Sequence, residues 1–314
     1  MNFSPEILCF ASGGVDLGFG HLYRLTSLIK SLKLDSKVTF LVTNQIEREF
    51  LQRERLQIFN KKSDKNLKFK HVIIDSKYNC MNILDQYVND DVNIIIIDNI
   101  EEWTKNATKI VVPSFFINQD DLERNNLSQN NRLHWGKPYS MLKEPKITNK
   151  KINNRILLTF GGSDPNNISH KILMIMKNTK YGDRLRLILG PGYQHSKSDL
   201  LKEIPDIEII EDSKNMQKEI SSASMIITSF GTTLQEVEFY GKKVIIGCNY
   251  DNDLEDFFWL KKYTRNKNSW KCLGNWNNLN TSLLYEFIEQ LDLADEPQID
   301  DDALWGKSWK ELLS

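Results

Sequence analysis

Apolar residues along this chain gather in short continuous runs, each separated from the next by a polar turn and a stretch with helical spacing. Continuous apolar runs are typical of parallel strands buried on both faces, whereas strands with one exposed face alternate. In the first half of the chain, helices fit residues 22–32 and 45–55. The apolar runs predict strands at 7–10, 38–42, 72–75, 93–98 and 109–113.

The alternation stops at residues 142–154, which are polar and interrupted by proline, as exposed linkers are. It then starts again, with helices predicted at 167–177 and directly after Gly231. Further strands are predicted at 155–160, 185–189, 207–210, 225–228 and 243–247. Two consecutive strand–helix series predict an α/β protein of two doubly wound, Rossmann-like domains with parallel sheets and a cleft between them.

We place the first domain at residues 1–148 and the second at 149–290. The remaining residues, 291–314, are predicted to form a helical tail, because Trp305, Trp309 and Leu312 have helical spacing within 301–313. We expect this tail to pack back on the first domain.

Composition excludes several other classes of protein. Of the 314 residues, 40% are hydrophobic and 26% charged, as in ordinary globular proteins, and the net charge of −1 does not favour nucleic acid or an anionic membrane as partner. No basic segment precedes an apolar one at the N-terminus, and no apolar run approaches the ~20 residues of a membrane span. The four cysteines form no CxxC pair, so reduced thiols and a cytoplasmic location are expected.

The first glycine-rich turn, residues 12–21 (SGGVDLGFGH), joins a strand to a helix. Glycines let a ligand approach the backbone, and the N–H groups of a helix start can bind an anion. His21 stands at the carboxyl end of a strand, where open α/β sheets bind ligands, and its imidazole can take a proton from a nucleophile. On spacing alone, His21 is either such a base or a residue that only caps the turn.

A second glycine turn, residues 158–165 (LTFGGSDP), also lies between a strand and a helix. Gly161, Gly162 and the Ser163 hydroxyl suit a diphosphate or the cleft between domains. The alternative is a tight turn in which Ser163 or Asp164 caps the helix. The residues leave both interpretations open.

The strongest candidate site is residues 226–236 (IITSFGTTLQE). A buried strand ends in Ser229, Gly231 allows close approach, and Thr232 and Thr233 begin a helix whose N–H groups and hydroxyls can hold a diphosphate without a metal ion. Glu236 follows one helical turn later, near the same face. Its carboxylate either accepts the two ribose hydroxyls of a nucleotide or is a solvated helix residue.

The remaining polar residues at strand ends are weaker candidates. Asp75 and Asp98 could bind a metal ion or substrate, or could simply cap loops. The five histidines show no HxH or HExxH spacing, and no GxSxG elbow occurs. We therefore expect no metal ion and no cofactor.

Five segments, in this order, resemble those of a known family, the UDP-2,4-diacetamido-2,4,6-trideoxy-β-L-altropyranose hydrolases of pseudaminic acid biosynthesis, with their spore-coat polysaccharide relatives. That family has the GT-B glycosyltransferase architecture and is similar to the undecaprenyl-linked muramyl-peptide N-acetylglucosaminyltransferase. The resemblance covers most of the chain. The segments are 18–24 (GFGHLYR), 75–78 (DSKY), 135–139 (WGKPY), 159–166 (TFGGSDPN) and 229–236 (SFGTTLQE).

The resemblance implies a role for each matching residue, with His21 as the catalytic base. The substrate-binding residues it implies are Gly20, Arg24, Asp75, Tyr78, Tyr139 and Asn252. The nucleotide-binding residues it implies are Gly161, Gly162, Ser163, Ser229, Gly231, Thr232, Thr233 and Glu236. The chain departs from the family pattern at Phe230, where a small residue is usual, at Asp253, where glutamine is expected, and in the acidic segment 296–302.

The sequence thus predicts a metal-independent hydrolase that cleaves a UDP-sugar to UDP and a free deoxy-amino sugar, in pseudaminic-type acid or surface-polysaccharide biosynthesis. The first domain would carry the catalytic and sugar side, and the second would bind the nucleotide. One alternative is a GT-B glycosyltransferase that passes the sugar to an acceptor hydroxyl. Another is a non-catalytic nucleotide-sugar binding protein. We expect a monomer whose partner is the nucleotide sugar.

Overall fold

The chain forms two compact units. Unit 1 comprises Met1–Glu144 with Asp302–Ser314, and unit 2 comprises Pro145–Asp301. The predicted boundary between residues 148 and 149 lies outside the described residues, and helix α10 (Leu283–Leu293) crosses the boundary predicted after residue 290. The computed structural model describes residues 5–14, 18–60, 64, 67–89, 91–99, 105–114, 122–123, 130–142, 154–204, 207–213, 215–262, 264, 266–299 and 305–314.

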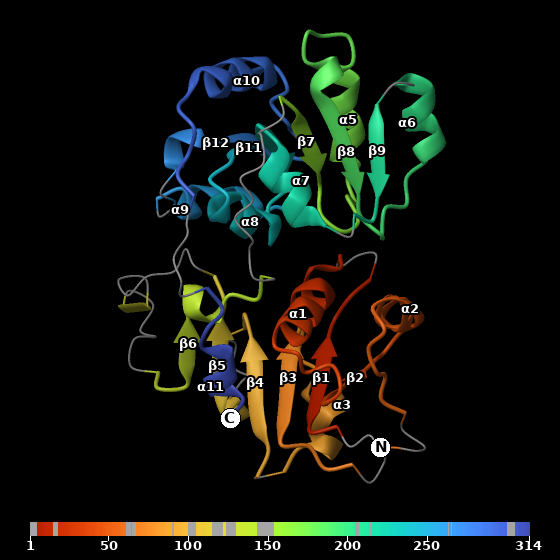
Figure 1. The fold of residues 1–314 in the computed structure, drawn as a ribbon, viewed down its shortest axis with the longest axis vertical. Helices are drawn as coiled ribbons and strands as arrows, with labels where there is room; N and C mark the ends of the chain where they lie inside the picture. The colour runs from red at the N-terminus through yellow and green to blue at the C-terminus, as the bar shows by residue number, and fades with distance from the viewer. Residues whose placement is uncertain are drawn as a thin grey trace. The chain divides into compact units, whose positions relative to one another are not determined.

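Unit 1 contains a six-stranded parallel sheet in the order β2-β1-β3-β4-β5-β6 (Figure 1). Its strands are β1 (Ile7–Ala11), β2 (Val38–Leu41), β3 (His71–Asp75), β4 (Asn93–Ile97), β5 (Lys109–Val112) and β6 (Leu133–Trp135). Its helices, before the tail, are α1 (Gly20–Ser31), α2 (Gln45–Arg53), α3 (Met81–Leu84), η1 (Asp85–Tyr87) and η3 (Lys137–Tyr139). The sequence did not predict β6, because this edge strand has only three half-buried residues and no apolar run.

The sheet of unit 1 is buried on both faces, as its continuous apolar runs predict. Ile7 and Cys9 of β1 enter one apolar core, whereas Leu8, between them, enters another. The chain order reverses direction at β1 and β3, which makes the gap between these two strands the topological switch point. Ligands of doubly wound sheets bind at the carboxyl ends of such strands.

The C-terminal residues belong to unit 1. Trp309 is fully buried and its indole Nε1 donates to the carbonyl of Tyr139 at 2.7 Å. The predicted helix over 301–313 is too long, since residues 305–308 form turns and only α11 (Trp309–Leu312) is helical. Gly306 has a φ of +66° and donates its N–H to Lys137, which interrupts the helix. Residues 301–304 lie outside the described part of the chain.

Unit 2 contains a second six-stranded parallel sheet, in the order β12-β11-β10-β7-β8-β9 (Figure 1). Its switch point lies between β7 and β10, the first and fourth strands of the unit. The strands are β7 (Ile156–Thr159), β8 (Leu185–Leu189), β9 (Glu208–Glu211), β10 (Met225–Thr228), β11 (Lys243–Cys248) and β12 (Trp270–Asn275), of which β12 was not predicted. The helices are α5 (Ile168–Met176), η4 (Gly182–Arg184), α6 (Lys197–Glu203), α7 (Met216–Ser222), α8 (Thr233–Phe239), α9 (Asp253–Leu260), η5 (Lys267–Ser269) and α10.

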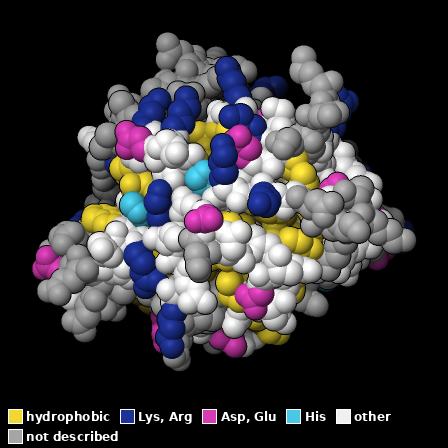
Figure 2. Space-filling model, turned by 90° about the horizontal axis from the view of Figure 1, so that it is seen from below, with side chains coloured by type: hydrophobic (Ala, Val, Ile, Leu, Met, Phe, Trp, Pro, Cys, Tyr) yellow, Lys and Arg dark blue, Asp and Glu magenta, His cyan; other side chains and the backbone are white. Residues whose placement is uncertain are grey.

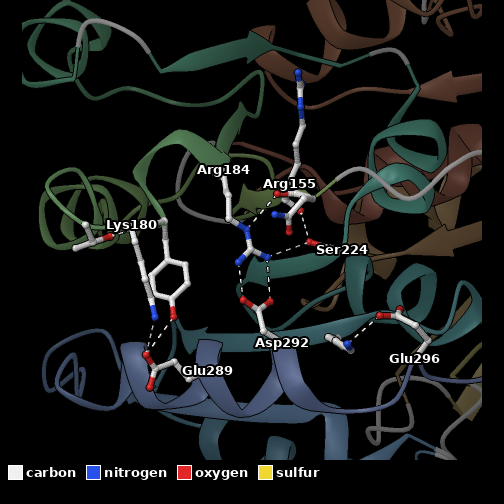
Figure 3. Close-up of polar contacts among 11 residues, drawn as sticks. Arg155, Lys180, Arg184, Ser224, Glu289, Asp292 and Glu296 are labelled. Atoms are coloured by element: carbon white, nitrogen blue, oxygen red, sulfur yellow. Dashed lines mark hydrogen bonds and ion pairs between the residues drawn. The ribbon is translucent and has the colours of Figure 1, made fainter.

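Ion pairs hold α10 at the amino edge of this sheet (Figure 3). Arg184, directly before β8, contacts both carboxylate oxygens of Asp292, and Lys180 lies 2.9 Å from Glu289. Such partly exposed pairs contribute little stability, about 0–1 kcal/mol each. These ion pairs lie at the amino ends of the strands. The loops that carry the candidate site follow the carboxyl ends of the strands, at the opposite edge of the sheet.

Basic side chains gather on the face of the molecule shown in Figure 2. The strands of unit 1 begin on this side in Figure 1, and exposed Lys37 and Lys70 both pair with Glu6 there, at 3.8 and 3.0 Å. Burial and the nearby ammonium of Lys109 lower the pKa of His71 on this edge. Basic side chains are therefore prominent on the side opposite the carboxyl edge of the sheet, although the net charge of the chain is −1.

No helix in the part of the chain that the structure describes is long and apolar enough to cross a membrane.

Candidate functional site

The first group of candidate residues lies at the switch point of unit 1. His21 is the second residue of α1, and Arg24 follows it by almost one turn, so that both side chains lie on one side of the helix. Asp75 is the last residue of β3 and pairs in register with Ala11, the last residue of β1. The fold therefore brings three predicted residues from two separate segments of the chain into direct contact.

A fully buried carboxylate holds the histidine. Nδ1 of His21 lies 2.6 Å from Oδ1 of Asp75, and the Asp75 side chain has no exposed surface. An ionised carboxylate only accepts hydrogen bonds, so this contact requires the proton on Nδ1. The neutral ring then carries its lone pair on Nε2, and a quarter of the His21 side chain is exposed. This is the arrangement in which a histidine acts as a general base.

Arg24 compensates the buried charge of Asp75. Its Nε and Nη2 atoms each donate to one oxygen of Asp75 at 2.6 Å, and its Nη1 donates to Asp98 at 2.8 Å. Burial alone would raise the pKa of Asp75, but the guanidinium of Arg24, the nearby His21 and their hydrogen bonds lower it to about 2. Asp75 is therefore ionised at any physiological pH.

The loop after β1 is fixed by an acidic residue that the sequence did not single out. Glu47, on α2 and almost fully buried, accepts hydrogen bonds from the backbone N–H groups of Gly13 and Thr43. Ser12 donates its N–H to the carbonyl of Asp75 at 3.1 Å. These bonds tie the loop to α2 and β3. Helix α2 contains two glutamates, Glu47 and Glu49, and its sequence gives no sign that Glu47 is the buried one.

The other residues predicted in unit 1 have different surroundings. Gly20 is exposed, and a Cβ added to it would meet nothing within 4 Å. Tyr78 is 57% exposed, three residues after Asp75. The hydroxyl of Tyr139 lies 3.1 Å from Nδ1 of His134, and its ring packs against Trp309. Tyr139 also packs against the apolar core of unit 1, and no hydrogen bond among the described residues joins its hydroxyl to His21.

The second group lies at the switch point of unit 2. A Cβ placed on Gly161 would lie 3.8 Å from Oγ of Ser229, so the turns after β7 and β10 adjoin. Gly161 has a φ of +76°, which favours glycine, and is exposed, whereas Ser229 is buried. Gly190, after β8, packs so closely on this turn that a Cβ there would lie 2.4 Å from the carbonyl oxygens of Gly161 and Gly162. The sequence did not identify this glycine, although the GPG sequence after a predicted strand could have marked it.

The structure resolves the open interpretation of Asp164. Its buried carboxylate accepts the backbone N–H groups of Ile168 and Ser169 and the Ser169 hydroxyl, at 2.9, 3.0 and 2.5 Å. Asp164 thus caps α5, and the N–H groups of the first two helical residues are occupied. Ser163 is buried beside it. For a ligand, this turn offers the backbone of Gly161 and Gly162 rather than the end of α5.

Glu236 is the unusual acid of unit 2. It lies in the first turn of α8, a helix of seven residues that begins at Thr233, and is partly buried together with Thr232 and Thr233. Burial raises the pKa of Glu236 to about 7. No hydrogen bond among the described residues reaches its carboxylate. An acid that is partly desolvated and has no partner in the described chain is suited to a ligand with hydroxyl donors.

The loop after β11 explains one departure from the family pattern. Asp253 stands where the family has glutamine, and its buried carboxylate accepts the N–H groups of Asn249 and Tyr250 at 2.9 and 3.0 Å. Asn166, from the turn after β7, donates to the carbonyl of Asn249 at 2.8 Å. Asn252, the predicted substrate residue, precedes α9 and is exposed. Asp253 therefore shapes the loop from which Asn252 projects.

No cluster of three or more metal-ligating side chains occurs among the residues that the structure describes. Asp75 is hydrogen-bonded to His21 and Arg24. The carboxylate of Glu236 has no hydrogen-bond partner among the described residues.

Both sheets and their connections define the class: the chain has the GT-B fold, as predicted. Solved structures of GT-B glycosyltransferases share it. UGT89C1 of Arabidopsis thaliana, complexed with UDP, superimposes with a TM-score of 0.60 at 12% identity over 92% of this chain and 91% of that chain. MurG of Acinetobacter baumannii superimposes with a TM-score of 0.55 at 13% identity and the same coverage of both chains. At such identities the likeness shows the fold alone.

Sequence comparison finds two distant relatives. The chain is 24% identical over 261 residues to the spore coat polysaccharide biosynthesis protein SpsG of Bacillus subtilis, covering 76% of this chain and 75% of that protein. It is 26% identical over 289 residues to the uncharacterized protein MJ1062 of Methanocaldococcus jannaschii, covering 80% of this chain but only 56% of the archaeal protein. No family model matches. The predicted relationship to spore-coat polysaccharide proteins is confirmed, whereas the narrower altropyranose hydrolase family stays a prediction.

Proposed function

We propose that the chain is a nucleotide-sugar hydrolase, in which unit 2 binds UDP and His21 of unit 1 activates water for attack at the anomeric carbon. The observation that carries this proposal is the contact between His21 and the buried, ionised Asp75, which leaves Nε2 as the basic atom. Both candidate groups lie at switch points of their sheets, where doubly wound folds bind ligands.

The reaction balances without another reactant. Water gives its proton to Nε2 of His21 as its oxygen bonds to the anomeric carbon, and the bond from that carbon to the β-phosphate oxygen breaks. The products are the free sugar and UDP, and the proton leaves His21 for solvent. A general base of this kind contributes about 10²–10⁴-fold to the rate.

The nucleotide is assigned to the adjoining turns at Gly161 and Ser229. Backbone N–H groups and the hydroxyls of Ser229, Thr232 and Thr233 would receive the diphosphate, whose negative charge increases as the bond breaks. Glu236 would accept hydrogen bonds from the two ribose hydroxyls. The UDP bound by the Arabidopsis protein of the same fold supports this choice of nucleotide.

For the sugar, the five segments similar to the pseudaminic acid enzymes favour a UDP-linked deoxy-amino sugar. The contacts we propose for the sugar are exposed Tyr78 and Gly20 in unit 1 and exposed Asn252 in unit 2. The likeness to SpsG favours surface-polysaccharide biosynthesis as the setting, with nonulosonic acids as the pathway class.

The second candidate is a GT-B glycosyltransferase. The observation that favours it is the fold itself, which the chain shares with transferases over more than nine-tenths of its length. The same base would then deprotonate an acceptor hydroxyl instead of water.

Product analysis in ¹⁸O-labelled water separates these reactions. The chain is incubated with UDP-linked N-acetylated amino sugars and no acceptor, and both products are examined by mass spectrometry. The hydrolase requires free sugar that carries ¹⁸O at its anomeric position, with unlabelled UDP. Label in UDP would mean cleavage of a phosphorus–oxygen bond and would contradict the proposed attack. Release of sugar only when an acceptor is added would establish the transferase.

A pair of histidine variants tests the base. His21→Gln should lower turnover about 10²–10⁴-fold while UDP still binds, because the amide cannot take the proton. His71→Gln is the matched control, since His71 lies at the opposite end of the strand that ends in Asp75. Equal turnover in His21→Gln and His71→Gln would exclude His21 as the base.

A further inference from the structure

The guanidinium group of Arg24 is largely engaged in hydrogen bonds with other residues of the chain. Each of its three guanidinium nitrogens donates to a carboxylate, two to Asp75 and one to Asp98, and its side chain is only 10% exposed. The family resemblance implies a substrate-binding role for this arginine. Its contacts in the structure indicate a different role, directed at the histidine one turn earlier.

The position of the proton on His21 depends on the charge of Asp75. Nδ1 lies 2.6 Å from Oδ1 of Asp75 and 3.2 Å from Nη2 of Arg24, so either atom could be its partner. If Asp75 is ionised, Nδ1 must donate to it. If Asp75 were protonated, Nδ1 could accept a hydrogen bond, and the ring proton would move to Nε2. The second tautomer has no lone pair on Nε2.

The two hydrogen bonds from Nε and Nη2 of Arg24 to Asp75 decide between these two tautomers of His21. Two parallel hydrogen bonds to one carboxylate favour its ionised form and fix the plane of the carboxyl group. Because Nη2 and Nδ1 share Oδ1 as acceptor, the direction of the His21 ring is set by the same contact.

Asp98 fixes the arginine from the other side. It directly follows β4, has a φ of +58°, and donates its N–H to Val111 on the neighbouring strand at 2.8 Å. This left-handed conformation is uncommon for residues other than glycine. It places the Asp98 carboxylate 2.8 Å from Nη1, the one guanidinium nitrogen that Asp75 does not contact.

We propose that Arg24 and Asp98 are positioning residues that act through Asp75 to hold His21 in the tautomer with its proton on Nδ1. As a claim about catalysis, this inference rests on the proposed role of His21 as the base. As a claim about the histidine, it can be measured without any substrate.

Long-range ¹H–¹⁵N spectra of the full chain report the protonated nitrogen of each of the five histidines, and His21→Gln identifies the signal of His21. We expect Nδ1 to be protonated in the unmodified chain. Arg24→Lys keeps the positive charge but loses the paired hydrogen bonds to Asp75. Asp98→Ala removes the hydrogen-bond acceptor of Nη1. Both should give a mixture of tautomers at His21. Asp91→Asn, which changes an exposed acid just before the other end of β4, should leave the signal unchanged.

Kinetics supply a second readout. Displacement of a base by a fraction of an ångström or a change of its tautomer should lower kcat about 10–100-fold in Arg24→Lys, with KM within about twofold. A raised KM with unchanged kcat and an unchanged tautomer would overturn the proposal and make Arg24 a substrate ligand. If Arg24→Lys does not fold, Asp98→Ala carries the test, because that side chain is 41% exposed. A shifted tautomer in a chain that hydrolyses no nucleotide sugar would retain the positioning role and refute the proposed function.

Discussion

Oδ1 of Asp75 lies 2.6 Å from Nδ1 of His21, although 54 positions separate the two residues in the chain. The contact joins the end of β3 to the start of α1 across the switch point of unit 1. It places an ionised carboxylate against one ring nitrogen of His21, which favours the tautomer with its proton on Nδ1. The same contact leaves a buried carboxylate whose charge affects the stability of unit 1.

Asp75 should make stability depend on pH in the acid range. Its folded pKa of about 2 is below the value of about 4 in an unfolded chain, so the folded state binds the proton less tightly. The contribution, about 2.5 kcal/mol, is complete above pH 4 and is lost as pH falls toward 2. Denaturant unfolding between pH 2 and 6 measures it. Asp75→Asn should remove this dependence and, by removing the buried charge that two guanidinium nitrogens of Arg24 contact, cost about 3–5 kcal/mol at pH 7. An unchanged pH profile in Asp75→Asn would show that the shift belongs to other acids.

Glu236 should make nucleotide affinity depend on pH near neutrality. Its pKa of about 7 means that the carboxylate, the form that accepts from both ribose hydroxyls, increases as pH rises from 6 to 8. UDP binding measured by calorimetry should therefore strengthen over that interval. Glu236→Gln should bind UDP more weakly and lose the dependence. The 2′,3′-dideoxy analogue of UDP is the ligand-side control, and an equal pH effect on that analogue would contradict the ribose contact.

The same shift has the opposite sign for the stability of the unliganded chain. A carboxyl group whose folded pKa is raised favours folding at low pH, and this advantage is lost as pH rises from about 4.5 to 7. Glu236→Gln should thus raise Tm at pH 8 and change it little at pH 5. A Tm that falls equally at both values would indicate that the glutamate supports the fold and is not held for a ligand.

Two glycine substitutions should separate packing from ligand contact. Gly190→Ala places a methyl group 2.4 Å from two carbonyl oxygens, so the turn at Gly161 must move, at a cost of about 1–3 kcal/mol. We expect lower Tm together with weaker UDP binding. Gly20→Ala has open space around it and should leave Tm unchanged. If Gly20→Ala also leaves KM unchanged, the proposed sugar contact at Gly20 is wrong.

The C-terminal residues should stabilise unit 1. Trp309 is fully buried and bonded to the carbonyl of Tyr139, so Trp309→Ala should destabilise this unit by about 3–5 kcal/mol. Unfolding monitored by hydrogen exchange distinguishes the two units. Lost protection in β1 and β4 with intact protection in β7 and β10 is the expected pattern. Lys310→Ala, next to Trp309 but exposed, is the control.

The sequence determined the class of fold. Runs such as 93–98 and 225–228 are continuously apolar because both faces of their sheets are covered, and that local pattern survives in any arrangement of the strands. It also marked the glycine turns and His21, since a strand followed by glycine and a helix start has a local signature. Strand β6 was not predicted, because its three residues are only half-buried and form no apolar run.

Tertiary structure decided what these residues do. Pairing of β1 with β3 brought Asp75 to His21 and Arg24, and the pairing of β7 with β8 and β10 brought Gly190 and Ser229 to the turn at Gly161. Glu47 looks like an ordinary surface acid in the sequence, and nothing in the sequence pairs Asp98 with Arg24, because spacing along a chain does not report the distance between strand ends. Charge, burial and proton position depend on those distances, and the fold of each unit supplies them.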